Sequence, residues 1–220
     1  GPASGRPPFA GRRPRGLGSP MRIAINAISA TSGGGRTYLL NLARVLPHVA
    51  SHQYRLYIPA SAAPALPGLP ANFEVVVQPG AERGYLARLL WEQIGLPASA
   101  KRWGADVLVC VGGFCPLRSA APVLLLSRNP LYFTPRFLTD LIERGHYAWA
   151  ARHLAMTRLA LWSAQAARLT ITPTDAMAAM MQALAGRRPL RLRTIFHGFQ
   201  LWPGLNGGPA VPPPAPPFRF

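Results

Sequence analysis

The chain alternates short, almost wholly apolar runs with longer segments in which apolar residues recur every three or four positions. The short runs predict strands, and the periodic segments predict helices. We expect strands over 22–27, 53–58, 73–78, 106–111, 122–127, 168–172 and 191–196. We expect helices over 36–46, 81–94 and 136–166, the last broken near Gly145, and one more helix that Thr174 caps.

Each predicted helix carries an apolar stripe that would face a sheet. The stripes are Tyr38, Leu39, Leu42 and Leu46; Leu86, Leu89, Leu90 and Ile94; Tyr147, Ala150, Leu154 and Leu161; and Met177, Met180, Met181 and Leu184. Apolar strands that alternate with helices are typical of a parallel sheet covered on both faces. The pattern therefore predicts an α/β domain with a Rossmann-like, doubly wound, mainly parallel sheet. Ligands of such sheets bind at the carboxyl ends of the strands, here the loops 29–37, 111–118, 127–135, 172–175 and 196–199.

Proline and glycine collect at the two ends of the chain. We expect a disordered basic leader over 1–20, one domain over 21–199, and over 200–220 a Pro-rich linker that leads into a second domain. Phe218-Arg219-Phe220 would be the first strand of that second domain, cut as it begins. Because Met21 directly precedes the first strand, the leader reads as upstream translated sequence or a cloning remnant. A basic arm that binds nucleic acid or lipid is the alternative.

The net charge is +17, from 24 basic and 7 acidic residues, and +13 remains without the four arginines of the first twenty positions. Such an excess attracts anions, whether nucleic acid, phosphorylated substrates or acidic lipid. Lys101 is the only lysine among many Arg, Ala, Pro and Gly residues, a bias that a GC-rich bacterial genome produces by itself. The charge therefore permits anion binding without requiring it.

No apolar run reaches the roughly 18–20 residues that span a bilayer, and the first twenty positions lack the apolar centre of a signal peptide. We expect a cytoplasmic protein, with peripheral contact to an anionic membrane as an option. Cys110 and Cys115 have no second Cys/His cluster beside them, so we expect free thiols and no metal site.

The stretch Thr31-Ser32-Gly33-Gly34-Gly35-Arg36-Thr37-Tyr38 follows the first strand and opens the first helix. Glycines let a ligand approach the backbone closely, and N–H groups at a helix start suit phosphate. A dinucleotide-binding loop fits poorly, because its third glycine would fall on Tyr38 and no acidic residue ends the second strand. A nucleoside-triphosphate loop would need a Gly-Lys-Ser/Thr that is absent. A phosphate loop of another kind and a plain strand-to-helix turn both remain open.

The same turn, with Asn26-Ala27 before it and Leu39-Leu40-Asn41-Leu42 after it, resembles the opening of glycosyltransferase family 4. Further similar segments follow in order over about 21–199. They are Arg88-Leu89-Leu90-Trp91-Glu92-Gln93, Leu96-Pro97, 105–108, 122–129, Ile171-Thr172-Pro173-Thr174 and Ile195-Phe196-His197-Gly198. The resemblance implies a GT-B enzyme, whose two Rossmann-like domains enclose the active site. The first domain binds the acceptor, and the second binds a nucleotide diphosphate sugar. It also implies transfer with retention, usually without a metal and with no cofactor beyond the donor.

Carried onto this chain, the resemblance places Gly33, Gly34 and Gly35 beside the donor diphosphate. Arg36, Tyr38, Arg128, Asn129 and Thr174 would face the cleft, and Trp91, Glu92 and Gln93 would shape or brace the acceptor side. Core packing is the alternative for Trp91, and an ordinary exposed helix charge is the alternative for Glu92.

Two features depart from the family pattern. The loop 127–132 carries Arg128-Asn129 where many members have a histidine, and asparagine cannot act as a general acid or base near neutral pH. His197 comes too late in the chain to replace that histidine and fits better as a hinge-side turn residue. We also expect the 220 residues to stop before the donor domain.

We therefore expect the acceptor-side domain of a retaining, hexosyltransferase-like enzyme, inactive alone, whose acceptor is a glycan or a lipid-linked molecule. The alternatives are a module that pairs with a separately encoded donor domain, and a basic nucleic-acid-binding protein. The arginines are scattered rather than clustered with aromatic residues, which disfavours nucleic acid as a partner.

Overall fold

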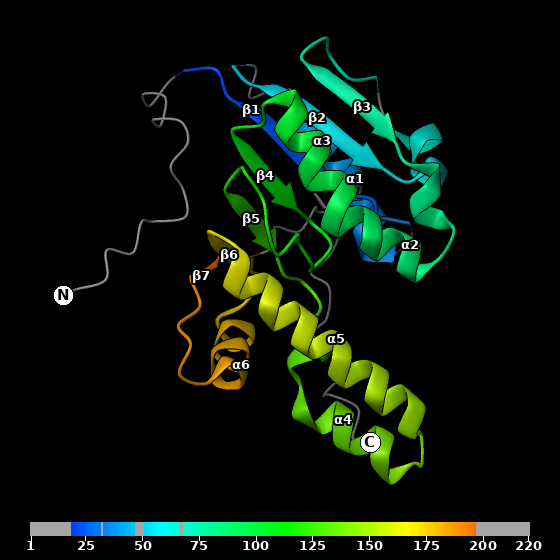
Figure 1. Ribbon diagram of the computed structural model, residues 1–220, viewed down its shortest axis with the longest axis vertical. Coiled ribbons are helices and arrows are strands. Elements are labelled where there is room, and N and C mark those ends of the chain that lie inside the picture. The colour runs from blue at the N-terminus through cyan, green and yellow to red at the C-terminus, as the bar shows by residue number, and fades with distance from the viewer. Residues whose placement is uncertain (1–18, 32, 47–50, 67, 197–220) are drawn as a thin grey trace, which may run out of the picture.

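Seven parallel strands form one sheet in the computed structural model, which describes residues 19–31, 33–46, 51–66 and 68–196 (Figure 1). The strands are β1 (Arg22–Asn26), β2 (Gln53–Ile58), β3 (Phe73–Val77), β4 (Val107–Cys110), β5 (Val123–Leu126), β6 (Leu169–Thr172) and β7 (Leu192–Thr194). Their order is β3-β2-β1-β4-β5-β6-β7. The predicted doubly wound α/β fold is confirmed. The expectations for the leader, His197, the linker and the incipient strand fall outside the described residues.

The helices follow the strands in the alternation that the sequence predicts. They are α1 (Gly33–Val45), α2 (Tyr85–Leu90), the π-helical η4 (Trp91–Gly95), α3 (Leu96–Trp103), α4 (Pro135–Glu143), α5 (Tyr147–Ala166) and α6 (Asp175–Ala185). Short 3-10 turns are η2 (Ala60–Ala65), η3 (Pro79–Glu82) and η5 (Pro130–Phe133). Gly145 separates α4 from α5 in a left-handed conformation, with φ of +73°, so the predicted break lies there.

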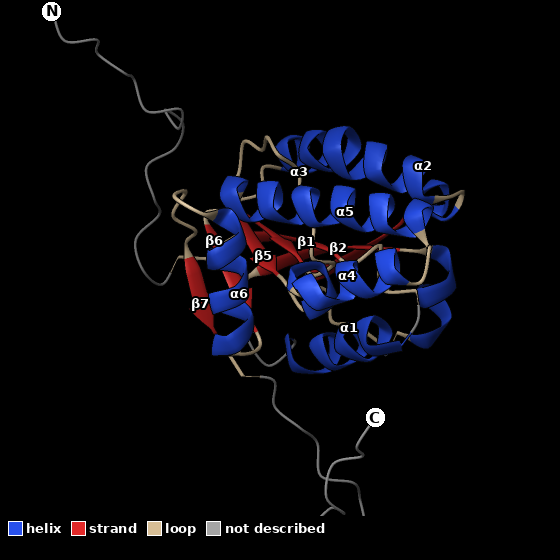
Figure 2. Ribbon diagram, turned by 90° about the horizontal axis from the view of Figure 1, so that it is seen from below, coloured by secondary structure: helices blue, strands red, loops and turns tan. Residues whose placement is uncertain are grey.

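The sheet is covered by two separate apolar clusters, one on each face. Leu96, Met156, Ala160, Met177 and Met181 bring α3, α5 and α6 onto one face. The other face packs against α1 and η2. Figure 2 shows the sheet between α2, α3 and α5 on one side and α1 on the other. Helices on both faces explain why most strands are apolar on both faces.

The chain reverses its direction of winding between β1 and β4, which are neighbours in the sheet. β1 pairs with β2 on one side and with β4 on the other, with Ile23 opposite both Tyr54 and Val107. Such a switch point opens a crevice at the carboxyl ends of the strands. The loops after β1, β4, β5 and β6 therefore meet along one edge of the sheet, which we call the carboxyl edge.

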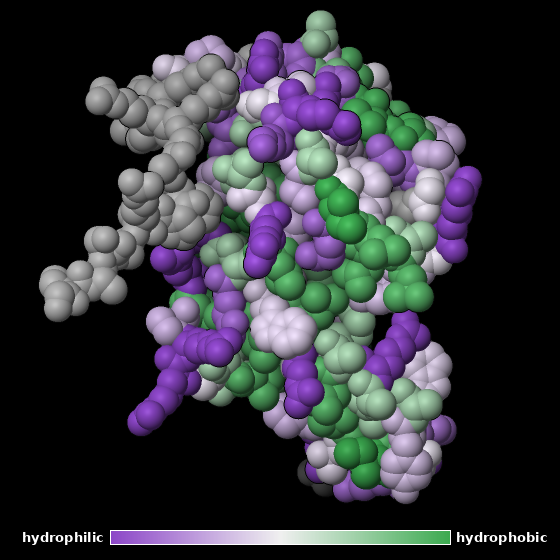
Figure 3. Space-filling view, in the orientation of Figure 1, coloured by the Kyte–Doolittle hydropathy of each residue, from purple (hydrophilic) through white to green (hydrophobic). Residues whose placement is uncertain are grey.

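The predicted stripe on 81–94 is wrong. The helix begins at Tyr85, and Leu86, Leu90 and Ile94 are 73%, 61% and 67% exposed. Tyr85 and Trp91 face the core instead, and the π-helical turn brings Glu92 inward as well. Figure 3 shows hydrophobic side chains gathered over α2 and the start of α3, with hydrophilic side chains beside them.

Two other stripes need smaller corrections. On α5, Tyr147 and Leu154 are exposed, and small residues such as Ala160 and Ala164 pack against the sheet with Met156. A helix that approaches a sheet through alanine lies too close to it for large side chains to fit between them. On α6, Met177 and Met181 are buried as predicted, but Leu184 is exposed at the end of the helix.

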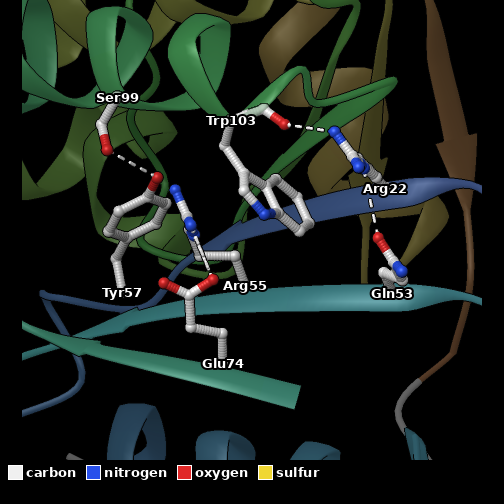
Figure 4. Close-up of polar contacts among 7 residues, drawn as sticks. All are labelled: Arg22, Gln53, Arg55, Tyr57, Glu74, Ser99 and Trp103. Carbon is white, nitrogen blue, oxygen red and sulfur yellow. Dashed lines mark hydrogen bonds and ion pairs between the residues drawn. The ribbon is translucent and has the colours of Figure 1, made fainter. Parts of the chain in front are cut away.

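Polar contacts fix the amino-terminal half of the sheet and the helix above it (Figure 4). Arg55 on β2 donates to Glu74 on β3, at 2.6 and 2.9 Å, and its guanidinium lies 4.8 Å from the centre of the Trp103 ring. Arg22 donates to the Gln53 side chain at 3.1 Å and to the Trp103 carbonyl at 3.0 Å. These contacts hold α3 over β1 and β2, far from the carboxyl edge.

Candidate functional site

The glycine run forms the first turn of α1 rather than a turn that precedes it. Gly33, Gly34 and Gly35 are helical, and the first turn contains no acidic residue. The first N–H groups of a helix have no intrahelical partner, and the helix dipole places positive potential there. Neither Gly34 nor Gly35 has a positive φ, and a Cβ built on Gly34 meets nothing within 4 Å. The fold does not require glycine at 34, so its bare backbone leaves room for a ligand.

Arg128 connects this helix start to the ends of two strands. It follows β5, and its guanidinium donates to the carbonyl of Gly34 at 3.4 Å and to that of Val111, after β4, at 3.0 Å. The guanidinium also stacks on the Tyr38 ring, 4.3 Å from its centre. Burial lowers the pKa of Arg128 and raises that of Tyr38. Arginine stays charged in proteins, so a poorly solvated cation lies beside the glycine turn.

A pocket of about 230 Å³ opens beside Arg128 along the carboxyl edge. Its walls are Tyr38, Leu126, Arg128, Ile171, Thr172, Pro173, Ile195 and Phe196. The Nε of Arg128 and the Oγ1 of Thr172 are buried, and neither has a hydrogen-bond partner within the described segments. The pocket is therefore largely apolar, with one cation and one unsatisfied hydroxyl at its wall.

Glu92 and Gln93 form hydrogen bonds to the chain at the carboxyl ends of β1 and β4. Glu92 is 3% exposed, not the surface charge that was the alternative, and its carboxylate accepts from the Asn26 amide at the end of β1, at 3.0 Å. Burial raises the pKa of Glu92. Gln93 donates to the carbonyl of Cys115 and accepts from the N–H of Leu117, both at 3.0 Å, which fixes the loop after β4.

The other predicted site residues are distributed unevenly. Trp91 packs in the core, with its ring 5.5 Å from that of Tyr57, while Arg36 is exposed beside the glycine turn. Asn129 and Thr174 are exposed caps that accept hydrogen bonds from the N–H groups of Leu131 and Met177. The structure thus brings Gly34, Tyr38 and Arg128 together. Trp91, Glu92 and Gln93 instead contact the core and the chain after β1 and β4.

Several residues at this edge are not among the predicted site residues. Asn26 ends an apolar strand and is 1% exposed, and Thr172 and Phe196 reach the pocket only because β5, β6 and β7 are neighbours. Ser29 lies against Gly112, where an added Cβ would collide with the serine side chain. A polar residue at the end of an apolar strand, such as Asn26, is the one signal that could have pointed to this edge.

The part of the chain that the structure describes contains neither a candidate metal site nor a membrane-spanning helix. No group of three or more His, Cys, Asp or Glu side chains there could hold a metal ion. No helix within 19–31, 33–46, 51–66 and 68–196 is long and apolar enough to cross a membrane.

Comparison with known proteins gives one strong match. The family model for Glycosyltransferase Family 4 matches residues 32–201, which include the glycine turn, Arg128 and the pocket. No curated protein matches the chain. Among solved structures, a mutant PPC decarboxylase complexed with pantothenoylaminoethenethiol is similar at 22% sequence identity, over 58% of this chain and 79% of that chain, with a TM-score of 0.26. That likeness carries no functional argument.

Proposed function

The chain belongs to glycosyltransferase family 4, and on that premise we propose that its carboxyl edge is the acceptor-side half of a retaining glycosyltransferase site. The donor would be a nucleotide diphosphate sugar, and the acceptor a glycan or a lipid-linked glycan. A second Rossmann-like domain would hold the donor nucleoside opposite this edge. The observation that carries the proposal is the half-buried Arg128 guanidinium beside the open backbone of Gly34.

The proposed chemistry follows from where negative charge develops. When the sugar is transferred, the bond between its anomeric carbon and the diphosphate oxygen breaks, and a bond to the acceptor hydroxyl oxygen forms. The acceptor hydroxyl gives up its proton, which passes to water, and the nucleoside diphosphate leaves with an added negative charge. The first turn of α1 and Arg128 supply a helix dipole and a poorly solvated cation where such a charge is stabilised.

The pocket favours an acceptor with an apolar face. Six of its lining residues are apolar or aromatic, and Arg128 adds one cation at the wall. Hydroxyl-bearing ligands with a ring or hydrocarbon face fit such walls. A lipid-linked glycan has both features.

Two matched alanine substitutions test the diphosphate site. Gly34 and Gly80 both lack a positive φ, and a Cβ on either meets nothing within 4 Å, so both variants should fold. By isothermal titration with pyrophosphate and nucleoside diphosphates, Gly34→Ala should weaken binding by roughly tenfold or more, about 1.4 kcal/mol, while Gly80→Ala should not. In the enzyme assembled with its donor domain, turnover should fall likewise. Unchanged binding and turnover in a folded Gly34→Ala protein would mean that the glycines begin α1 but do not bind the diphosphate.

A further inference from the structure

The outer face of α2 and η4 exposes an apolar stripe that no described element covers. Leu86, Leu90 and Ile94 are spaced four residues apart and are all more than half exposed. Isolated exposed leucines are common, but three on one helical stripe form a continuous apolar strip. The fold gains nothing from this strip in water, so the strip points to a surface that covers it.

The strip continues onto the start of α5 through a stacked group of side chains. The Tyr85 hydroxyl donates to the sulfur of Met156 at 2.9 Å, which joins α2 to α5. The Arg152 guanidinium lies 6.0 Å from the Tyr85 ring centre and 5.3 Å from that of Trp149. Trp149 is 61% exposed. We call Leu86, Leu90, Ile94 and Trp149 with the flanking arginines 83, 88 and 152 the α2–α5 surface.

Charge on this surface is mainly positive. Arg83 and Arg152 are exposed, and Arg88 lies 5.2 Å from the Tyr85 ring centre. Of the acidic side chains near it, Glu92 is buried, and Glu82 is an exposed carboxylate that accepts hydrogen bonds from Ser61. A second copy of the chain packed on this surface through a two-fold axis would bring the same arginines together, which like-charge repulsion opposes.

We infer that the α2–α5 surface docks on an anionic lipid bilayer. A helix that pairs an apolar strip with flanking arginines lies in the interface, with its apolar side chains among the acyl chains. Exposed arginines are attracted to acidic headgroups, and tryptophan is favoured at the boundary between headgroups and acyl chains. The strip, the charge and Trp149 each favour this occupant over a neutral protein surface.

The placement of the surface links the bilayer to the carboxyl edge. α2 follows the carboxyl end of β3, and the α4–α5 hairpin extends beyond the carboxyl end of β5 (Figure 1). A bilayer against α2 and the start of α5 would therefore lie next to the edge that carries Arg128. Vesicle binding needs neither a donor nor catalysis. The inference can therefore fail while the proposed function holds, and the proposed function can fail while the inference holds.

Sedimentation with vesicles tests the inference on the whole chain. The probes are vesicles of phosphatidylcholine alone and of phosphatidylcholine with phosphatidylglycerol, at low and at high salt. The chain should bind the anionic vesicles more tightly, and high salt should weaken that binding. The triple variant Leu86→Gln, Leu90→Gln, Ile94→Gln should bind them roughly tenfold less tightly or worse. Arg83→Gln with Arg152→Gln should lower binding at low salt only.

A control variant distinguishes binding through this surface from nonspecific binding through other exposed apolar residues. Val45 and Leu184 are exposed apolar residues on α1 and α6, and Val45→Gln with Leu184→Gln should bind vesicles as the parent does. Both sets of variants keep the arginines of the first twenty positions, so binding through those arginines would leave the triple variant unaffected and would overturn the inference. Equal binding to neutral and anionic vesicles would overturn it too. The inference would also be overturned if the parent were a dimer, the triple variant a monomer, and both bound vesicles equally.

Discussion

The side-chain amide of Asn26 donates a hydrogen bond of 3.0 Å to the carboxylate of Glu92, and both residues are almost fully buried. Asn26 in turn accepts from the N–H of Ile28, at 3.3 Å, so the bond ties the π-helical turn to the chain just after β1. The carboxylate is thus held between the sheet and the helices, where water cannot solvate its charge well.

Replacing that carboxylate by an amide should change how stability depends on pH. Burial raises the pKa of Glu92 above the ordinary value of 4.5. The folded protein therefore holds the proton more tightly than the unfolded chain does, and stability falls as pH rises from 4.5 through the folded-state pKa. Glu92→Gln keeps an acceptor for Asn26 and has no proton to lose. Its stability relative to the parent should therefore rise over that pH range and then level off.

Urea unfolding of both proteins from pH 4 to pH 8 measures this difference. Glu143→Gln, which changes an exposed carboxylate on α4, is the control and should track the parent. A Glu92→Gln protein whose stability relative to the parent does not vary with pH would show that burial does not control the titration of Glu92.

Arg128→Lys should weaken the carboxyl edge although it keeps the charge. Lysine cannot bond two carbonyls and stack on Tyr38 in the planar geometry of a guanidinium. We expect a loss of about 1–2 kcal/mol in the free energy of unfolding and weaker pyrophosphate binding. Arg36→Lys, at an exposed position beside it, should leave stability unchanged. Parental stability and affinity in Arg128→Lys would mean that only the charge matters.

Gly112→Ala should destabilise the protein by roughly 1–3 kcal/mol through overpacking. The added Cβ would lie 3.0 Å from the Cβ of Ser29 and would collide with its hydroxyl. Ser29→Gly should recover much of the loss in the double variant, because it removes the obstructing side chain. Denaturant titration of the two single variants and the double variant measures the coupling. Strictly additive losses would show that the contact between Gly112 and Ser29 is not the cause.

Both thiols should be inert in the folded protein. Burial raises the pKa of Cys115 to about 12 and that of Cys110 well above its ordinary value. Because the thiolate is the reactive form, Ellman's reagent at pH 8 should label neither thiol in the native protein and both after unfolding in guanidinium. Glutathione under the same conditions controls for the reagent. Rapid labelling of the native protein would mean that the loop after β4 opens readily.

The strands were predictable from the sequence because a short, continuous apolar run between turn residues suits a strand that is buried on both faces. The strand over 53–58 has the predicted bounds, and the others differ by one or two residues at an end. The start of α1 was placed too late, because glycine is a poor helix former, and nothing in the local sequence shows that Gly33–Gly35 begin the helix.

The site was predictable as a set of loops and not as a set of contacts. Gly34 and Arg128 both come shortly after the carboxyl end of a strand, so their presence at one edge was expected. Their contact depends on β1, β4 and β5 being neighbours, which is a property of the whole sheet. The inward position of Glu92 depends on the π-helical turn, and a shift of one residue in helical register leaves no mark in hydrophobic periodicity.

The central position of β1 has a consequence for how the protein is made. The strand is the first to leave the ribosome, yet its two neighbours are β2 and β4. At typical synthesis rates, on the order of ten seconds pass between Ile23 and its second partner, Val107. During that interval one edge of this interior strand is unpaired. A nascent chain stalled before β4 should therefore depend on chaperones that bind extended apolar segments, and the completed chain should depend on them less.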